Sequence, residues 1–444
     1  LSHTQTQLRS VLAQQKIAHA GALQDNKRSD WPAVQRKIED GVIQVFTQMA
    51  SFDWLRPYRA PEEVTAVGSG FFINEQGDIL TNYHVVAQAR SIKIRLPRLG
   101  QEQFAAEIVG VCPDRDIALL RLPEAVRMRI VQRLGRISHL VLGECDQVIR
   151  TQEVMALGFP HGRLSLKSTI GNVSGWERMG NQSFIQLTSP LNPGNSGGPA
   201  VNRAGMVVGV NAAGIQEAQN TGFFIPITEI KHVLRNLYTT KLLRKPILGG
   251  DFAMYMEPVR EYLGNPKGGG WYVTHVYEGT LLAKAGVKKG DVLYEINGYQ
   301  LDQYGDVEVS WATDSKVSAL DLLNRYGVGD TLSLVVYRRG QRKECILTLD
   351  DKFILPVRKV YPDFEPVDYE ICGGMVLMHL NLNIIQLLLS KNSALTPSLA
   401  RYLRPDKQYD NAIVVTHVFP GSPAQEAKLI DVGLIIDTIN GQSI

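Results

Sequence analysis

A long series of short apolar or alternating runs, separated by turn-forming residues, most limits the folds open to this chain. Many short strands and few long helices predict an antiparallel, mainly β domain of the barrel or sandwich type. A helical pattern at Ile227–Leu237 then closes this region. The runs are Val42–Met49, Gly70–Ile73, Ile79–Thr81, Ser91–Leu96, Ala105–Val111, Ile117–Leu122, Glu153–Leu157, Phe184–Leu187, Met206–Asn211 and Thr221–Pro226.

An internal repeat follows a basic connection that ends at Pro246. The segment 247–250 reads Ile-Leu-Gly-Gly, and the segment 371–374 reads Ile-Cys-Gly-Gly. Downstream, Val-Thr-His-Val-Tyr at 273–277 is matched by Val-Thr-His-Val-Phe at 415–419. Self-similarity of this kind is typical of tandem domains that share one fold.

The two copies differ in their later parts. The first continues into an amphipathic helix predicted at Val317–Tyr326 and two strands, Leu332–Tyr337 and Glu344–Leu349. The second carries a longer connection, 381–411, with a helical pattern, and the sequence stops at Ile444. We therefore expect the second copy to lack its C-terminal part in this chain, and to serve domain contacts or assembly. The predicted divisions are an N-terminal arm at 1–30, the β domain at 31–240, the first repeat at 241–352, a linker at 353–370 and the second repeat at 371–444.

Composition narrows the possible partners. The chain of 444 residues has 47 basic and 44 acidic residues, a formal net charge of +3, which argues against nucleic acid or a membrane surface. Its most apolar run, 375–389, is interrupted by polar residues and falls short of the ~20 residues of a membrane span. The four cysteines lack CxxC spacing, so neither a zinc site nor a disulfide scaffold is expected, and the redox compartment stays open. The chain begins with leucine and shows no signal-like stretch, so we expect any targeting segment to have been removed or left out.

A glycine-rich turn at 192–199, Asn-Pro-Gly-Asn-Ser-Gly-Gly-Pro, presents Ser196 just before a strand. Glycines allow several backbone N–H groups to converge beside a side-chain nucleophile, which is how an oxyanion hole is built. His84 stands where a strand ends, and Asp116, with Asp114 as its rival, stands where an apolar strand begins. Each residue alone is more often structural, but the order His, Asp, Ser within a β domain favours a catalytic triad.

The residues that carry these motifs also resemble the HtrA/Deg family of trypsin-like serine endopeptidases. The resemblance implies a mainly β fold, with a trypsin-like double β-barrel followed by two PDZ-like α+β domains, the second incomplete. The broken second copy is more similar to the plant-type Deg branch. The matching segments are Gly68–Ile73 with Thr81–His84, Asp116–Leu120, Gly194–Pro199 and Gly222–Pro226.

The resemblance implies a role for each matching residue. Ser196 is the nucleophile, His84 the general base and then the general acid, and Asp116 orients the imidazole, being the carboxylate that directly precedes Ile-Ala-Leu-Leu. The N–H groups of Gly194, Asn195 and Ser196 form the predicted oxyanion hole. Further expected sites are a substrate pocket at Leu191, Ala213 and Ile215, a regulatory arginine at Arg178, and a PDZ peptide site at Ile247, Leu248, Gly249 and Gly250.

Two positions bear on how the site is controlled. Asn195 is neutral, so it cannot pair with a newly made N-terminal ammonium, and activation by N-terminal cleavage is not expected. Thr188 stands where the family usually has an aspartate, so this residue supplies no charge for an ion pair of the kind that helps order the activation loops elsewhere in the family. Control by ordering of loops around the site is the expected alternative.

The expected function is that of an ATP-independent serine endopeptidase, without metal or cofactor, that degrades unfolded or damaged proteins. The resemblance further implies homo-oligomers of trimers or their multiples, binding of C-terminal peptides by the PDZ-like domains, and a periplasmic or otherwise exported location, with an organelle as the alternative. A chaperone or peptide-binding scaffold with little turnover and a pure PDZ adaptor are the competing hypotheses.

Overall fold

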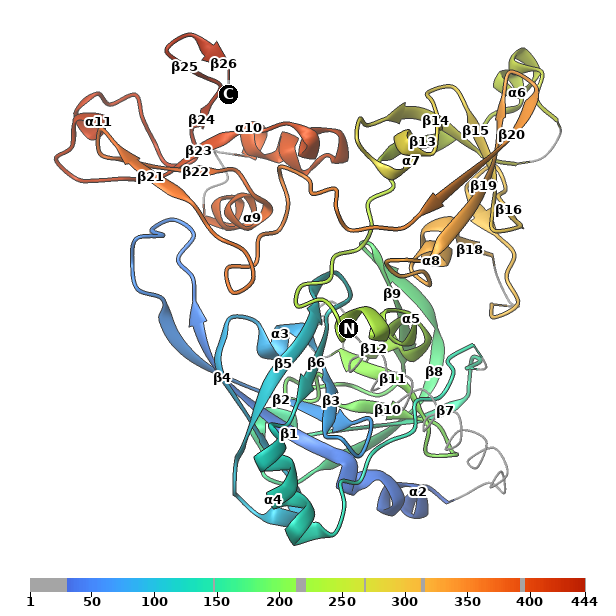
Figure 1. The fold of residues 1–444 in the computed structure, drawn as a ribbon, viewed down its shortest axis with the longest axis vertical. Coiled ribbons are helices and arrows are strands. Elements are labelled where there is room, and N and C mark those ends of the chain that lie inside the picture. The colour runs from blue at the N-terminus through green and yellow to red at the C-terminus, as the bar shows by residue number, and fades with distance from the viewer. Residues whose placement is uncertain are drawn as a thin grey trace. The chain divides into compact units, whose positions relative to one another are not determined.

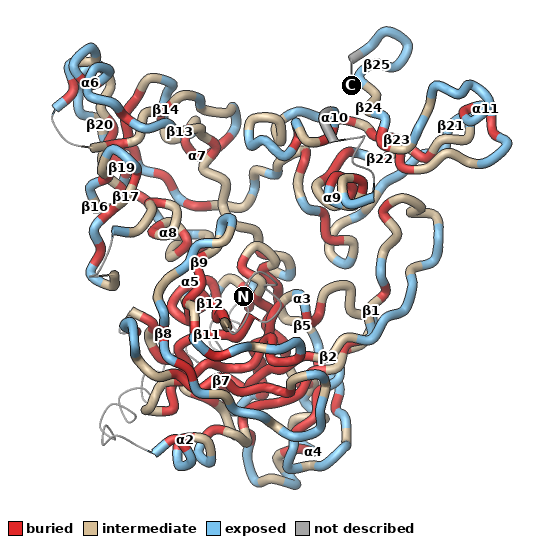
Figure 2. The backbone as a smooth tube through the Cα atoms, turned by 180° about the vertical axis from the view of Figure 1, so that it is seen from behind, coloured by how far each residue is buried: buried red, intermediate tan, exposed pale blue. Residues whose placement is uncertain are grey.

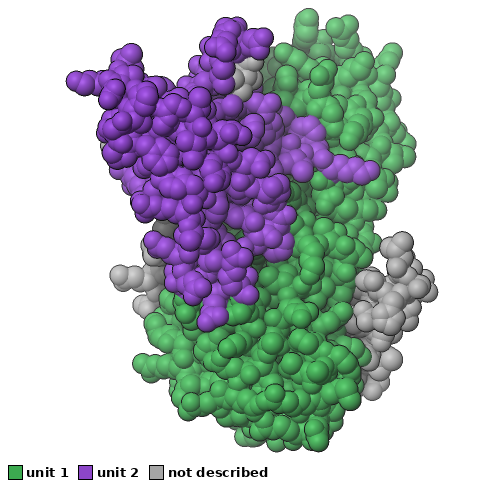
Figure 3. Space-filling view, turned by 60° about the vertical axis from the view of Figure 1, so that its left-hand side comes forward, with its two compact units in different colours: residues 1–47, 65–87, 91–351 green, residues 48–64, 88–90, 352–444 purple. Residues whose placement is uncertain are grey.

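The computed structural model of the chain describes residues 30–146, 148–212, 221–266, 269–312, 316–391 and 396–443. These residues group into two compact units (Figure 3). Unit 1 comprises residues 1–47, 65–87 and 91–351, and unit 2 comprises residues 48–64, 88–90 and 352–444. Unit 2 is therefore discontinuous along the sequence.

The described part of unit 1 begins with helix α2 (Trp31–Ile38), and two closed six-stranded barrels follow it (Figure 1). The strand order of the first barrel is β1-β2-β3-β6-β5-β4. Short helical segments, α3 (Tyr83–Val86) and η3 (Pro113–Arg115), connect its strands at the end that carries the predicted site. Its strands are β1 (Val42–Ser51), β2 (Glu62–Phe72), β3 (Asp78–Thr81), β4 (Ala89–Arg95), β5 (Phe104–Cys112) and β6 (Ile117–Arg121), with α4 (Glu124–Leu134) after them.

The second barrel has the order β10-β11-β12-β9-β8-β7 and is followed by helix α5 (Ile227–Leu237). Apolar side chains of both barrels and of α5 form one hydrophobic core, and burial is densest in these strands (Figure 2). Removal of this apolar surface from water is the main force that holds the barrels together. The strands are β7 (Glu153–Gly158), β8 (Lys167–Met179), β9 (Gln182–Leu187), β10 (Pro199–Val201), β11 (Val207–Ala212) and β12 (Gly222–Pro226). The predicted mainly β, double-barrel fold is confirmed.

The rest of unit 1 is an α+β region with a separate apolar core. Its main sheet has the order β13-β14-β15-β19-β20, with β13 (Gly250–Met254) at one end. The helix predicted at Val317–Tyr326 is shorter, because Ser318 is extended and its side chain caps α8 (Ala319–Leu323). The other elements are α6 (Glu257–Leu263), β14 (Trp271–Val276), α7 (Leu281–Lys284), β15 (Val292–Ile296), β16 (Tyr299–Gln300), β17 (Asp306–Val307), β18 (Val317–Ser318), β19 (Thr331–Arg338) and β20 (Gln341–Thr348).

Unit 2 contains a four-stranded sheet of order β21-β22-β23-β24. Strand β22 pairs with β21 on one side and with β23 on the other, whereas the corresponding strand of the first repeat, β13, pairs with β14 alone among the described strands. The predicted helical connection contains α9 (Leu382–Lys391), α10 (Thr396–Ala400), η6 (Arg401–Leu403) and η7 (Pro405–Tyr409). The remaining elements are β21 (Tyr369–Cys372), β22 (Met375–His379), β23 (Ile413–Val418), α11 (Pro423–Glu426), β24 (Ile435–Ile436), β25 (Thr438–Ile439) and β26 (Gln442–Ser443).

The segment 48–64, which connects β1 to β2, packs within unit 2. Trp54 is 8% exposed and belongs to the apolar core formed by α9, β22 and β23. The ring of Tyr58 lies 5.9 Å from that of His417 and 5.2 Å from that of Phe419. This connection of the first barrel therefore supplies part of the core of unit 2.

Candidate active site

His84 and Asp116 form a close pair at one end of the first barrel. His84 Nδ1 lies 2.7 Å from Asp116 Oδ2, and the backbone N–H of His84 donates to Asp116 Oδ1 at 2.9 Å. The side chain of His84 is half exposed, so its other ring nitrogen can face a reactant. Asp114, the rival carboxylate, instead accepts a hydrogen bond from the backbone N–H of Lys245 at 2.9 Å.

Asp116 has an unusual backbone conformation between η3 and β6. Its φ of 51° and ψ of 44° are left-handed, which costs a non-glycine residue roughly 1–2 kcal/mol. Its N–H donates to the Pro113 carbonyl at 3.0 Å, and its carbonyl accepts from Asn82 Nδ2 at 2.9 Å. Asn82 directly precedes α3, which carries His84, so one buried amide links the two segments of the pair.

The pKa of His84 is raised above its ordinary value of 6.5. Burial favours the neutral ring, but the hydrogen bond to Asp116 and the charge of Asp116 together outweigh it. An imidazole with a raised pKa is a stronger base for the proton of a hydroxyl nucleophile. The arrangement is that of a general base with its orienting carboxylate.

Ser196 lies in a turn that is attached to strand β2 of the first barrel. The turn has positive φ at Gly194 (99°) and at Gly197 (83°), as glycine allows. Ser69 Oγ donates to the Gly194 carbonyl at 2.6 Å and accepts from the Phe159 N–H at 3.0 Å. The Ser69 N–H also donates to the Ser196 carbonyl at 2.8 Å. Ser69, buried completely, therefore holds the turn on both sides of Asn195.

The same turn lies against the segment that carries His84. A Cβ atom added to Gly68 would stand 2.6 Å from Val85 Cγ1 and 3.3 Å from the Ser196 carbonyl oxygen. A Cβ atom on Gly197 would stand 3.1 Å from the Asn82 nitrogen. The residues that flank His84 and the residues around Ser196 therefore meet at the end of β2 and β3, where glycine leaves room for both.

The predicted oxyanion hole needs one correction. The Asn195 N–H donates to the Asn192 carbonyl at 3.0 Å inside the turn, so it is not available to an oxyanion. The Pro193 carbonyl accepts from the His161 N–H at 2.7 Å. Because a trans peptide is planar, the Gly194 N–H of the same peptide points away from His161. The assignment of the Gly194 and Ser196 N–H groups as oxyanion donors stays a prediction.

The other predicted residues of the barrels are placed as follows. Leu191 is partly buried, and a Cβ atom on Gly222 would come within 2.7 Å of its Cγ. Ala213 and Ile215 lie outside the described residues. Thr188 Oγ1 accepts from the Asn172 N–H at 2.9 Å, so its hydroxyl joins the loop to β8 without a charge.

Arg178 lies on β8 of the second barrel and contacts the α+β region, whereas the segment 247–250 belongs to that region. Arg178 Nη1 donates to Ser318 Oγ, the cap of α8, at 3.1 Å, and its Nε lies 4.0 Å from Asp321 Oδ1. Leu248 packs against the apolar core of the first repeat, and its carbonyl accepts from the Leu282 N–H at 3.0 Å. Gly249 has a φ of 82°, and its carbonyl accepts from the Tyr277 N–H at 3.0 Å. The carbonyl groups of Leu248 and Gly249 thus hold the turn in place at the start of β13.

The described residues contain neither a group of three metal-ligating side chains suited to an ion nor a helix with the length and apolar character to cross a membrane.

Ser69, Asn82 and His161 are residues of the site that the sequence reasoning missed. Ser69 stood within the quoted Gly-Ser-Gly segment, but nothing in its local pattern indicated a bond to a turn 125 residues away.

Comparison with known proteins agrees with this geometry. Residues 68–210 match the family model of the trypsin-like peptidase domain. A probable periplasmic serine endoprotease, DegP-like, from Hahella chejuensis is 32% identical over 297 residues, which cover 65% of this chain and 58% of that protein. The serine protease Do-like HtrA of Bacillus subtilis is 30% identical over 314 residues, 65% of each chain. The chain thus spans less than two thirds of these relatives.

A solved structure of the HtrA-type protease AlgW with a tripeptide has the same fold, with a TM-score of 0.55 and 24% identity over 72% of this chain and 97% of that one. The double barrel and the matched family model identify a trypsin-like peptidase domain in this chain. Beyond this domain, the chain is similar to serine proteases of the HtrA and DegP type. Its similarity to the plant-type branch stays a prediction.

Proposed function

We propose that the chain is an ATP-independent serine endopeptidase that cleaves unfolded or damaged proteins. The observation that carries the proposal is the His84–Asp116 pair, with its raised histidine pKa, beside a glycine-rich turn that holds Ser196. In this mechanism Ser196 Oγ attacks the peptide carbonyl while His84 accepts its proton and later passes it to the leaving amine. The N–H groups of Gly194 and Ser196 stabilise the oxyanion.

A fluorophosphonate probe and casein, an unfolded substrate, test this proposal together. We expect the wild-type chain to be labelled on Ser196 and to degrade casein without ATP, and Ser196→Ala to do neither. Labelling without degradation would favour the peptide-binding scaffold, and an unlabelled, inactive wild type would refute the peptidase proposal. Identical secondary structure in the two proteins, measured by circular dichroism, is the control for folding.

The first PDZ-like region is proposed to bind apolar C-terminal peptides along β13. Support comes from the position of β13 at the end of its sheet and from the Gly249–Gly250 turn at its start. An added peptide strand would pair with β13, and its carboxylate would meet the N–H groups of the turn. Arg178, which contacts the cap of α8, is proposed to report the state of this region to the loops around Ser196.

Leu248→Asp should weaken binding of an apolar C-terminal peptide at least tenfold, because it places a carboxylate beside the peptide carboxylate and an apolar core. Fluorescence anisotropy with a labelled peptide measures the Kd. The equally charged substitution Leu429→Asp, at a side chain 84% exposed in unit 2, is the matched control. Equal affinities for wild type and Leu248→Asp would contradict this peptide site.

The proposal also includes an assembly, a location and domain boundaries. We propose trimers or multiples of trimers, and a periplasmic or otherwise exported location, which is supported by the names of the bacterial relatives. The proposed limits remain 31–240 for the peptidase domain, 241–352 for the first PDZ-like domain and 371–444 for the second. The end of unit 1 at residue 351 supports the second of these limits.

A further inference from the structure

Arg115 stands directly before Asp116, at the end of η3, and is the largest of the fully buried side chains. A buried guanidinium is costly unless each of its charged donors finds an acceptor. Arg115 Nη2 donates to the carbonyls of Asn324 at 3.1 Å and Tyr326 at 3.2 Å, and Nη1 approaches Cys112 Sγ at 3.8 Å. Among the described residues it forms no ion pair, so its position is set by backbone carbonyls.

These carbonyls belong to Asn324, which caps α8, and to Tyr326, two residues further along the chain. The helix ends at Leu323, with Asn324 as its cap, and the last carbonyls of a helix have no partner within it. Arg115 supplies that partner from a segment 209 residues away in the sequence. The end of α8 and the turn that precedes Asp116 are thereby joined through one side chain.

The turn η3 is held from other directions as well. Gln182 Nε2 donates to the Arg115 carbonyl at 3.0 Å, and the Lys245 N–H donates to Asp114 at 2.9 Å. Asp116 needs such support because a left-handed aspartate persists only where its surroundings impose that conformation. A small displacement of η3 would move the carboxylate that receives the two hydrogen bonds from His84.

We infer that Arg115 is a positioning residue for Asp116, and that it holds the catalytic carboxylate in register with the C-terminal end of α8. This inference rests on the proposed function. Arginine is favoured because its rigid planar group directs Nη2 to two carbonyls while Nη1 approaches Cys112 Sγ, whereas the ammonium of lysine is a compact point charge on a flexible stem. The carboxylate of the His84–Asp116 pair is therefore positioned from the first PDZ-like region, through contacts that do not include Arg178.

The charges around Arg115 determine which variant is informative. Burial raises the pKa of Glu229 to about 7, against the opposing charges of Lys245, Arg115 and Arg325. Burial, together with the charge of Arg115, lowers the pKa of Lys245 to about 8. Removal of the Arg115 charge would change the pKa of Glu229 and that of Lys245. The substitution Arg115→Lys keeps the positive charge and removes only the planar guanidinium, so it gives the cleaner comparison.

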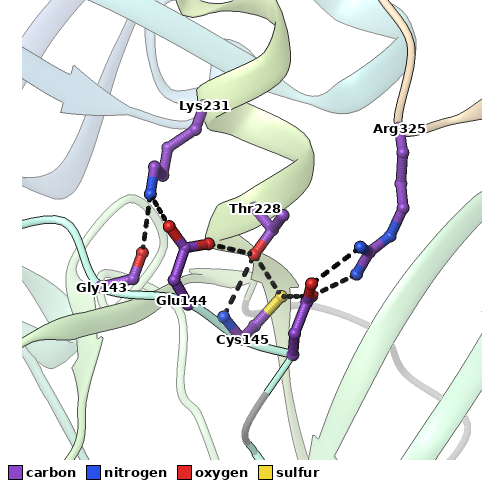
Figure 4. Close-up of polar contacts among 7 residues, drawn as sticks. Gly143, Glu144, Cys145, Thr228, Lys231 and Arg325 are labelled. Carbon is purple, nitrogen blue, oxygen red and sulfur yellow. Dashed lines mark hydrogen bonds and ion pairs between the residues drawn. The ribbon is translucent and has the colours of Figure 1, made fainter. Parts of the chain in front are cut away.

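Arg325 supplies a matched control from the same region. Its guanidinium pairs with Asp146, beside a cluster in which Cys145 and Glu144 contact Thr228 and Glu144 pairs with Lys231 (Figure 4). Cys145 is completely buried, and its burial raises the pKa of the thiol to about 12. Arg325→Lys therefore alters an ionic contact between the α4–β7 connection and the first repeat, and this contact includes no residue of η3.

The test is a steady-state pH profile of wild type, Arg115→Lys, Arg115→Ala and Arg325→Lys on one short peptide substrate. We expect kcat to fall about tenfold in Arg115→Lys and about 100-fold in Arg115→Ala, with KM within twofold, because misplacement of a catalytic group by about 1 Å can cost 10²-fold. The acidic limb of kcat/KM should move to lower pH in Arg115→Lys, because His84 loses part of the interaction that raises its pKa. Arg325→Lys should keep the wild-type limb and kcat.

Each outcome bears on the inference. An Arg115→Lys variant that keeps both the wild-type kcat and the wild-type limb overturns it, as does an Arg325→Lys variant that shifts as far as Arg115→Lys. A wild type that is neither labelled by fluorophosphonate nor active refutes the proposed function and this inference together, whereas a labelled wild type with unchanged Arg115 variants refutes only the inference. If Arg115→Ala does not fold, by circular dichroism and thermal melting, Arg115→Lys decides the matter.

Discussion

Replacement of Asp116 by asparagine is expected to lower kcat by about four orders of magnitude while the fold is retained. In the serine protease template, the same change leaves the geometry intact but stabilises the wrong histidine tautomer. The Asp116 carboxylate lies 2.7 Å from His84 Nδ1, and asparagine would replace it with an uncharged amide. The amide oxygen could still accept from the His84 backbone N–H. Single-turnover and steady-state kinetics on a peptide substrate measure the loss.

The pH dependence gives this variant a second readout. The base must be neutral, so kcat/KM of the wild type falls as the pH drops below the raised pKa of His84. Without the Asp116 charge, burial remains and favours the neutral ring, so the acidic limb should move to lower pH. Folding stability depends on pH in the opposite direction. The pair stabilises the fold fully below the ordinary histidine pKa of 6.5, and this contribution is lost as pH rises through the raised pKa of His84.

Asp114→Asn is the matched control, and an equal loss of activity in both variants would contradict the assignment of Asp116.

Ser69→Ala is expected to lower kcat about 10²-fold, the cost of one misplaced oxyanion donor. Its hydroxyl joins the Gly194 carbonyl to the Phe159 N–H, so its removal frees the peptide that bears one candidate donor and leaves a buried N–H without its acceptor. The free energy of unfolding should fall by roughly 1–3 kcal/mol. Peptide kinetics and urea titration measure the two effects.

A buried hydroxyl on β1 provides the control for Ser69→Ala. Thr47 is completely buried, and its hydroxyl has no hydrogen-bond partner in the described part of the chain. Thr47→Val should therefore leave kcat unchanged and should not lower the free energy of unfolding. If Ser69→Ala retained full kcat while its stability fell, the role of Ser69 would be confined to folding.

The sequence was informative where function depends on residue type and order. The short strands predicted the barrels, and the order of His84, Asp116 and Ser196 predicted which segments would meet. The repeat predicted two regions of related topology, and the sheets that begin at β13 and β21 have related strand pairings. These signals are local patterns or internal repeats, and both can be recognised in a single sequence.

What the sequence could not indicate depends on contacts between distant segments. Ser69 and Arg115 have ordinary local surroundings, and their importance arises from partners 125 and 209 residues away. The predicted donor Asn195 was wrong because the turn directs its N–H to Asn192. The helix after residue 317 was predicted too long because Ser318 favours an extended cap over a helical position.

The connection 48–64 has a consequence for how such proteins evolve. Trp54 and Tyr58 belong to the core and ring contacts of unit 2, although they are encoded between the first two strands of the barrel. Recombination that exchanged only the part of the gene encoding residues 352–444 would leave these aromatic side chains without their partners. The loop and the second repeat are therefore expected to be inherited together, and the second repeat is not an interchangeable cassette.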